Sequence, residues 1–291
     1  MDVFKLRSVD IGEIPLTRQN VELHTQKKSP WFVHEEGETH HFAVCPACDN
    51  PIQLIRLYDD RYAPFGKHYR SGRRQRLGTY SEEHYDACPY AAKNRNQRPD
   101  KEFRRGKSEL TDKIKLTLIE QFDRAIYLLE KQLAIKISRR IATEMLGDFI
   151  AARGWQYGGA TTQNIPWIFA YFSLSKSLFG QKCSSQTLQQ AICDRYPEAI
   201  WVDDVLKSKG GYLSPRFCFL YHHRQVVEQH LSETITFSVS DDKQQVIFEQ
   251  VMPIDGSEFS RLQRIPEEKS QHLRQWHWVE LAREVFNERG A

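Results

Sequence analysis

Two cysteines separated by two residues, Cys45 and Cys48, have the side chains best suited to chemistry, and a third thiol follows at Cys88. Two thiolates at this spacing reach one tetrahedral metal ion at about 2.3 Å from each sulfur. The pair lies between strand-like runs at residues 39–44 and 51–58, which favours a zinc knuckle in a β-hairpin over a redox dithiol at a helix N-terminus. The sequence therefore predicts a zinc site.

Two histidines compete for the fourth position of this site. Ser81 is placed to cap a short helix that carries His84 and Cys88. The two residues are four positions apart, so on this helix their side chains would share one face. His68 stands in a loop rich in aromatic residues, and His40 and His41 are further candidates. A zinc ion with four protein ligands has no open position, so we expect a structural role for the metal and not a catalytic one.

The order of these residues resembles that of zinc-ribbon and treble-clef modules in nucleic-acid-handling bacterial proteins. The shared features are a CxxC pair, a strand, a histidine beside an aromatic residue and a later cysteine. The resemblance covers residues 40–92 and is one of class, since no specific protein family is identified. It implies a module folded around zinc, and it supports His68 as a competitor of His84 for the fourth position.

A basic segment surrounds the predicted metal ligands. Residues 61–107 carry 13 Lys/Arg against 5 Asp/Glu, whereas the whole chain has a net charge of +3. Aromatic residues are interleaved with these charges, and arginine beside aromatic rings is the composition that contacts phosphates and stacks on bases. The same rings could instead form the core of the small module. The side chains expected to bind nucleic acid are Lys67, Arg70, Arg73, Arg74, Arg76, Arg104 and Arg105.

A weaker pattern concerns catalysis. Arg224 and His230 are separated by five residues in a helix-like run, a spacing that resembles the Arg-x4–6-His signature of HEPN-type ribonucleases and implies cleavage of RNA. Arg216 and His222 repeat the spacing, although Phe217 departs from the polar residue expected after the arginine. Such a pair arises readily by chance, so a surface helix is the simpler interpretation and no catalytic centre is expected.

The pattern of elements predicts an α+β fold in three parts. Residues 1–107 form the zinc-binding β-hairpin module, residues 108–231 a mainly helical domain, and residues 232–291 a β-hairpin and a C-terminal helix packed on that domain. Residues 1–38 look irregular or weakly stranded, and the last helix opens at Pro266. Helices are expected at residues 110–137, 141–152, 167–179, 186–195, 197–207 and 215–231, with a strand over 217–221 as the alternative for the last, and the hairpin at 234–248.

The chain has no run of about 18 apolar residues, so we expect no membrane span. Its first residues lack the apolar stretch of a secretory signal, so we expect a cytoplasmic protein with reduced cysteines. These features together favour a zinc-binding, nucleic-acid-binding accessory or regulatory protein over an enzyme, with DNA and RNA both open as partners. A protein–protein adaptor with a structural zinc site is the alternative, and a HEPN-like ribonuclease is a weaker one.

Overall fold

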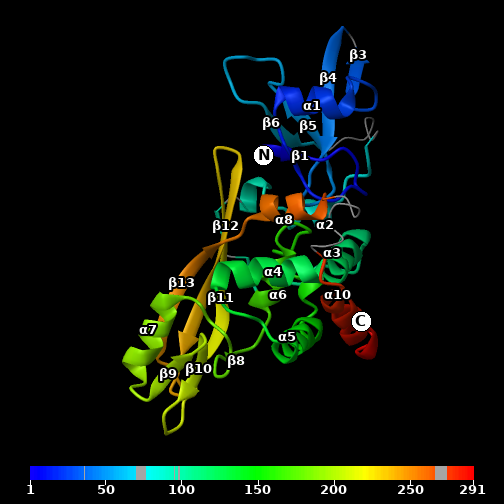
Figure 1. The fold of residues 1–291 in the computed structure, drawn as a ribbon. Helices are drawn as coiled ribbons and strands as arrows, with labels where there is room; N and C mark the ends of the chain where they lie inside the picture. Colours follow the sequence, from blue (N-terminus) through cyan, green and yellow to red (C-terminus); the bar gives the residue numbers. More distant parts are fainter. Residues whose placement is uncertain (36, 70–76, 95, 98, 266–273) are drawn as a thin grey trace.

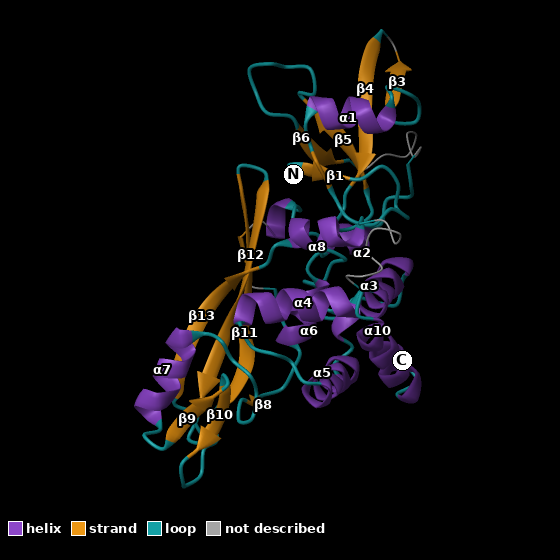
Figure 2. Ribbon diagram, viewed as in Figure 1, coloured by secondary structure: helices purple, strands orange, loops and turns teal. Residues whose placement is uncertain are grey.

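The computed structural model describes residues 1–35, 37–69, 77–94, 96–97, 99–265 and 274–291. In these residues the chain forms an N-terminal module of short strands at one end of the molecule (Figure 1). A long antiparallel sheet and a group of helices beside it make up the rest (Figure 2). The expected α+β class is confirmed.

The N-terminal module contains two antiparallel sheets and two short helices. Its larger sheet has the order β3-β4-β5-β6 and consists of β3 (Phe32–Glu35), β4 (Glu38–Val44), β5 (Pro51–Ile55) and β6 (Phe65–His68). The remaining elements are β1 (Val3–Phe4), β2 (Ile14–Pro15), α1 (Arg18–Thr25) and α2 (Glu82–Asp86). The strands expected on either side of the CxxC pair are confirmed as β4 and β5.

Residues 1–38, expected to be irregular or weakly stranded, contain three short strands and also a helix, α1, that the sequence did not indicate. Thr17 begins α1, since its side chain accepts a hydrogen bond from the backbone N–H of Asn20. Only Val21 and Thr25 of this helix are buried. An apolar stripe this narrow does not stand out in the sequence, and neither does a strand of two residues.

Helices pack on one another and on the long sheet, with α6 against β11 and α7 against β13. They are α3 (Glu109–Glu120), α4 (Phe122–Leu133), α5 (Arg139–Ala151), α6 (Ile165–Tyr171), α7 (Gln186–Arg195), α8 (Gly256–Gln263) and α10 (Trp276–Glu288). The expected helices at 141–152 and 186–195 are confirmed as α5 and α7. The segment 266–273, where the last helix was expected to open, lies outside the described residues.

The single helix expected over residues 110–137 is wrong. The chain bends at Gln121, where φ is −120° and ψ is 21°. Helix α4 then ends at Leu133, because the next residue, Ala134, is in the left-handed region with φ 54°. Buried apolar residues recur at three- and four-residue steps on both sides of the bend. The sequence pattern is therefore the same as that of one continuous helix. The helix expected over 167–179 is likewise shorter, because α6 ends at Tyr171.

The long sheet has the order β13-β12-β11-β7, and β8 pairs with β11 as well. Its strands are β7 (Asn96–Gln97), β8 (Lys176–Ser177), β11 (Arg216–Val227), β12 (His230–Ser240) and β13 (Val246–Pro253). The hairpin expected over residues 234–248 is confirmed as part of β12 and β13. The helix expected over 215–231 is wrong, and its strand alternative is confirmed.

A β-bulge in β11 explains the wrong expectation for this segment. Phe217 and Phe219 face the core, but the register shifts between Leu220 and His223, and the next buried residues are His222 and Arg224. The bulge therefore turns two polar residues inward, which removes the alternation of apolar residues that marks a strand.

The helix expected over residues 197–207 is also wrong. This segment forms a hairpin of β9 (Ala199–Val202) and β10 (Val205–Ser208). Asp203 and Asp204 make its two-residue turn with φ values of 52° and 64°, the left-handed conformations that such a turn requires. The apolar residues of this segment fit both the spacing of three to four residues of a helix and the alternation of a strand. Only the turn therefore distinguishes strand from helix.

The described residues contain two separate clusters of buried apolar side chains. One extends from Leu110 to Phe286, and the other from Met1 to Ala91, with Val226 and Leu231 at the end of the β11–β12 hairpin packed against it. The predicted boundary between 231 and 232 falls inside β12, and the division into three domains stays a prediction. Within the described part of the chain, no helix is long and apolar enough to cross a membrane.

Candidate metal centre

Three thiols and one imidazole meet inside the N-terminal module. The ligand atoms of Cys45, Cys48, His68 and Cys88 all lie within 4.8 Å of one another. The three sulfurs are buried, and the imidazole is half-buried. Among the described residues this is the only group of three or more His, Cys, Asp and Glu side chains arranged to hold a metal ion.

Three segments of the chain position the four ligands. Cys45 follows β4, and a tight turn returns the chain through Cys48 to β5, with the N–H of Asp49 donating to the carbonyl of Cys45 at 3.0 Å. Asp49 has φ 60°, which closes the knuckle. His68 is the last residue of β6, which is paired with β5, and so it returns to the same end of the sheet.

Cys88 reaches the site from the segment that follows α2. A buried amide holds this segment in place, because Asn94 Nδ2 donates to the carbonyls of Asp86 and Cys88, both at 2.7 Å. A second amide joins the knuckle to the start of α2, since Asn50 donates to the Ser81 carbonyl at 2.9 Å and accepts from its N–H at 2.7 Å. These bonds hold the ligand-bearing segments in position.

The distances agree with a tetrahedral zinc site. Zn–S bonds of about 2.3 Å and Zn–N bonds of about 2.05 Å in a tetrahedron separate two sulfurs by about 3.8 Å, and a sulfur from a nitrogen by about 3.6 Å. The observed Sγ–Sγ distance from Cys45 to Cys88 is 3.8 Å. Nε2 of His68 lies 3.3 Å from Sγ of Cys48 and 3.8 Å from Sγ of Cys88. The donor set and its spacing therefore suit a metal ion such as zinc.

Burial is the largest effect on the pKa of each of the three thiols. Burial raises the pKa of Cys45 and of Cys48 above the ordinary value. Burial acts in the same direction on Cys88, but hydrogen bonds from the other two thiols, together with the Arg224 charge, bring the pKa of Cys88 well below its ordinary value. Metal binding requires the deprotonated thiols, and the charge of a divalent cation favours that form.

The histidine question left open by the sequence has a geometric answer. The expected helix at Ser81 forms, with Ser81 Oγ accepting from the His84 N–H at 3.3 Å. However, α2 ends before Cys88, so the two side chains do not share a helical face, and His84 Nε2 lies 3.3 Å from Ser108 Oγ instead. His40 lies beside Gln53, and His41 packs on Phe32.

The structure separates the seven residues expected to bind nucleic acid into three groups. Arg70, Arg73, Arg74 and Arg76 lie outside the described residues, and Lys67 is exposed on β6. Arg104 packs its guanidinium 4.9 Å from the ring centroid of Phe172 and donates to the Ala152 carbonyl at 2.8 Å. Arg105 is only 3% exposed, so it faces the protein interior and is removed from the expected surface.

The arrangement expected for a HEPN-type ribonuclease is not formed. Arg224 lies on β11 and His230 begins β12, so the pair does not sit on one helix, and Arg216 and His222 are likewise on β11. Arg224 is 2% exposed, whereas His230 is exposed and hydrogen-bonds to Asp2 at 2.8 Å. The helical interpretation of this segment is therefore wrong, and the catalytic role of Arg224 and His230 stays a prediction.

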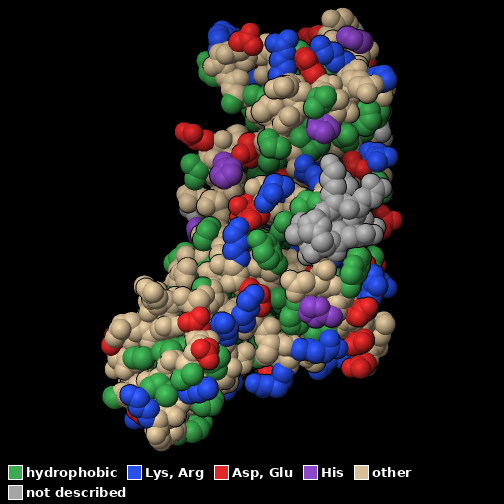
Figure 3. All heavy atoms as spheres, viewed as in Figure 1, with side chains coloured by type: hydrophobic (Ala, Val, Ile, Leu, Met, Phe, Trp, Pro, Cys, Tyr) green, Lys and Arg blue, Asp and Glu red, His purple; other side chains and the backbone are tan. Residues whose placement is uncertain are grey.

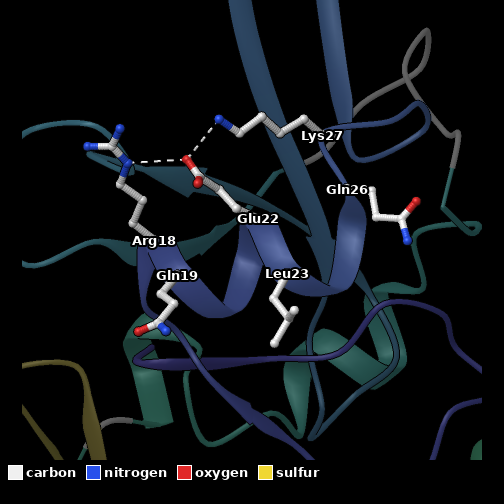
Figure 4. A pocket seen from close by; sticks show the side chains of 6 residues that line it. All are labelled: Arg18, Gln19, Glu22, Leu23, Gln26 and Lys27. Carbon is white, nitrogen blue, oxygen red and sulfur yellow. Dashed lines mark hydrogen bonds and ion pairs between the residues drawn. The ribbon is translucent and has the colours of Figure 1, made fainter.

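The two cations that line the hollow on α1 are paired. On α1, Arg18 and Lys27 both contact the Glu22 carboxylate at 3.2 Å, beside an open surface hollow of about 810 Å³ (Figure 4). The face of the molecule in Figure 3 mixes Lys/Arg with Asp/Glu side chains and does not gather one sign of charge. Arg18 and Lys27 are therefore already paired with Glu22 and do not make the hollow on α1 an anion site.

No protein-family model, curated protein or solved structure matches this chain. The Cys₃His cluster agrees with the general class of zinc-binding module expected from the sequence, and it identifies no family.

Proposed function

We propose that this protein binds one zinc ion through Cys45, Cys48, His68 and Cys88, and that the metal has a structural role. The observation that supports this proposal is the spacing of the four ligand atoms, which agrees with a zinc tetrahedron on both the sulfur and the nitrogen distances. Four protein ligands leave no open coordination position. When bound, zinc supplies cross-links among β4, β6 and the segment after α2 in a module with a small apolar core.

Elemental analysis of the purified full-length protein tests the zinc proposal. We expect about one equivalent of zinc per chain after expression with sufficient metal, and loss of most of it in Cys45→Ser. Cys183→Ser is the matched control, because Cys183 is a buried thiol that lies outside the cluster. Well under half an equivalent in the wild type would refute the proposal.

We further propose that the zinc module presents a surface for nucleic acid. The supporting observation is an exposed stack beside β6: the Arg56 guanidinium lies 4.4 Å from the ring centroid of Tyr62 and 5.7 Å from that of Phe65. Tyr62 is 54% exposed, so its ring is accessible to a base. Exposed Lys67 follows on β6, and the arginine-rich run 70–76 comes directly after this strand in the chain.

Polynucleotide binding at several salt concentrations tests this second proposal. Reversing Arg73, Arg74 and Arg76 to Glu should weaken binding at least about tenfold and flatten the log–log salt slope by about 2 to 3, because three phosphate contacts are lost. Tyr62→Ala should weaken single-strand binding with little change of slope.

The control variant reverses Lys182, Lys207 and Lys209, three exposed lysines far along the chain from the module, and matches the change of net charge. Equal losses in both triple variants, or no binding by the wild type at low salt, would refute the nucleic-acid proposal. The second result would favour the adaptor alternative, in which the module contacts another protein.

A further inference from the structure

An open groove of about 500 Å³ lies between α3 and residues 8–11 of the N-terminal module, and is called here the α3 groove. Three apolar side chains line it, and all of them are exposed: Val9 by 71%, Ile11 by 50% and Leu116 by 54%. A single exposed apolar side chain is ordinary in a folded protein. Three that line one groove are typical of an interaction surface.

Hydrogen bonds fix the module side of the α3 groove. The Arg7 N–H donates to the Asp10 carboxylate at 2.9 Å, and the Asp10 N–H donates to the Arg7 carbonyl at 3.1 Å, which closes a turn. Lys113 of α3 donates through Nζ to the carbonyls of Ser8 and Asp10. Val9 lies between these two anchored residues, so this wall is formed before a partner binds. A partner then loses less affinity to the ordering of the groove.

The α3 side of the groove is one face of the helix. Glu109, Asp112, Leu116 and Glu120 line the groove and recur at steps of three and four residues. Leu116 is the only exposed apolar residue of α3. From the first of these residues to the last the face is about 16 Å long, at about 1.5 Å per residue. It therefore has the length to contact several turns of a partner helix.

The rim of the α3 groove is acidic. Lys113 is the only cation among the described residues that line it, and its ammonium already contacts Asp49 at 3.5 Å. Glu120 is paired with Arg283 at 2.5 Å. The carboxylates of Glu109 and Asp112 have no hydrogen-bond or ion-pair partner in the part of the chain that the structure describes. The rim therefore repels phosphate and attracts a cationic group.

We propose that the α3 groove binds a basic amphipathic segment of a partner protein. Its apolar side chains would pack on Val9, Ile11 and Leu116, and its lysine or arginine side chains would pair with Glu109 and Asp112. Charge complementarity selects this occupant, because the acidic rim excludes an acidic segment and a nucleic acid. The proposal is independent of the zinc site and of the surface beside β6. Since the walls come from the module and from α3, the bound segment contacts both.

Binding of a labelled synthetic peptide to the full-length protein tests the proposal. The probe is a helical peptide of about 14 residues, or about 21 Å, with leucine at helical spacing and lysine at the other positions. One comparison peptide has glutamate in place of lysine, and another has serine in place of leucine. Fluorescence anisotropy should show binding of the probe and much weaker binding of both comparison peptides.

Variants of the groove separate its apolar and its acidic parts. Leu116→Ser and Ile11→Ser should each weaken binding of the probe about tenfold, because each removes a side chain that the peptide covers. Glu109→Gln combined with Asp112→Asn should weaken it about tenfold at low salt and remove most of its salt dependence.

Matched controls lie on other surfaces. Leu23→Ser changes a leucine of α1 that is also exposed, and Glu280→Gln with Glu288→Gln removes two exposed carboxylates of α10. Neither control should change binding of the probe. All the substituted side chains are on the surface, so the melting temperatures should stay close to that of the wild type.

Three results would overturn the proposal: equal losses in groove and control variants, a comparison peptide that binds as tightly as the probe, and no binding of the probe at low salt. Self-association of the wild type that Leu116→Ser abolishes in sedimentation would assign the groove to a second copy of the chain, and would also overturn it. Should a variant fail to fold, a photo-cross-linking group on the probe decides the question. It should label residues 8–11 or α3 of the wild type, and labelling elsewhere would refute the proposal.

Discussion

Replacing His68 by alanine removes the only nitrogen from a set of four candidate zinc ligands. Structural zinc sites bind with apparent free energies of about 10–16 kcal/mol, so one ligand in four accounts for about 3 kcal/mol, or about a hundredfold in affinity. His84→Ala is the matched control. It removes a contact of 3.3 Å with Ser108, which begins α3, and should cost about 1 kcal/mol of stability without changing zinc affinity.

Competition with a chromophoric zinc chelator measures both affinities, and thermal unfolding of the zinc-loaded proteins separates affinity from stability. The expected result is a large loss of affinity for His68→Ala and a small loss of stability alone for His84→Ala. The reasoning is refuted if His84→Ala loses zinc affinity as strongly as His68→Ala. It is also refuted if neither variant differs from the wild type, since the assignment of His68 would then be wrong.

Three further outcomes concern stability. Burial, followed by the Asp2 charge, raises the pKa of Glu13 from 4.5 to about 7. As pH rises, the unfolded chain loses the Glu13 proton before the folded protein does, so the stability of the fold decreases between these two pKa values. Glu13→Gln should therefore raise the melting temperature at pH 8 and leave it unchanged at pH 4. Arg274→Met leaves buried Asp123 without its ion-pair partner at 2.7 Å. The free energy of unfolding in urea should fall by about 3–5 kcal/mol, and a loss below about 1 kcal/mol would contradict this prediction. A Cβ at Gly154 would lie 2.2 Å from the ring of Phe149, so Gly154→Ala should lower the urea midpoint by the equivalent of about 1–3 kcal/mol, and an unchanged midpoint would contradict the packing described here.

The local sequence determined those elements whose sequence pattern is contained within a few neighbouring residues. The knuckle needs only the CxxC spacing and a strand on each side, and both strands form as expected. Ser185 caps α7 through a hydrogen bond from Leu188, and the sequence locates this helix correctly because its cap and its apolar positions are adjacent. The position of Cys88 near the knuckle was also foreseeable, since thiols in a reduced protein are natural metal ligands.

Tertiary structure decided everything that depends on contacts between distant segments. His68 rather than His84 joins the thiols because α2 ends before Cys88 while the pairing of β6 with β5 carries His68 to the knuckle. Arg224 faces inward because a bulge changes the register of β11, and no local pattern announces that change. Arg105 is of a residue type that binds phosphate, and it lies in a basic segment of the sequence, yet it is buried. The sequence specifies which charges are present, but only the packing of the long sheet against the N-terminal module determines which of them lose contact with water.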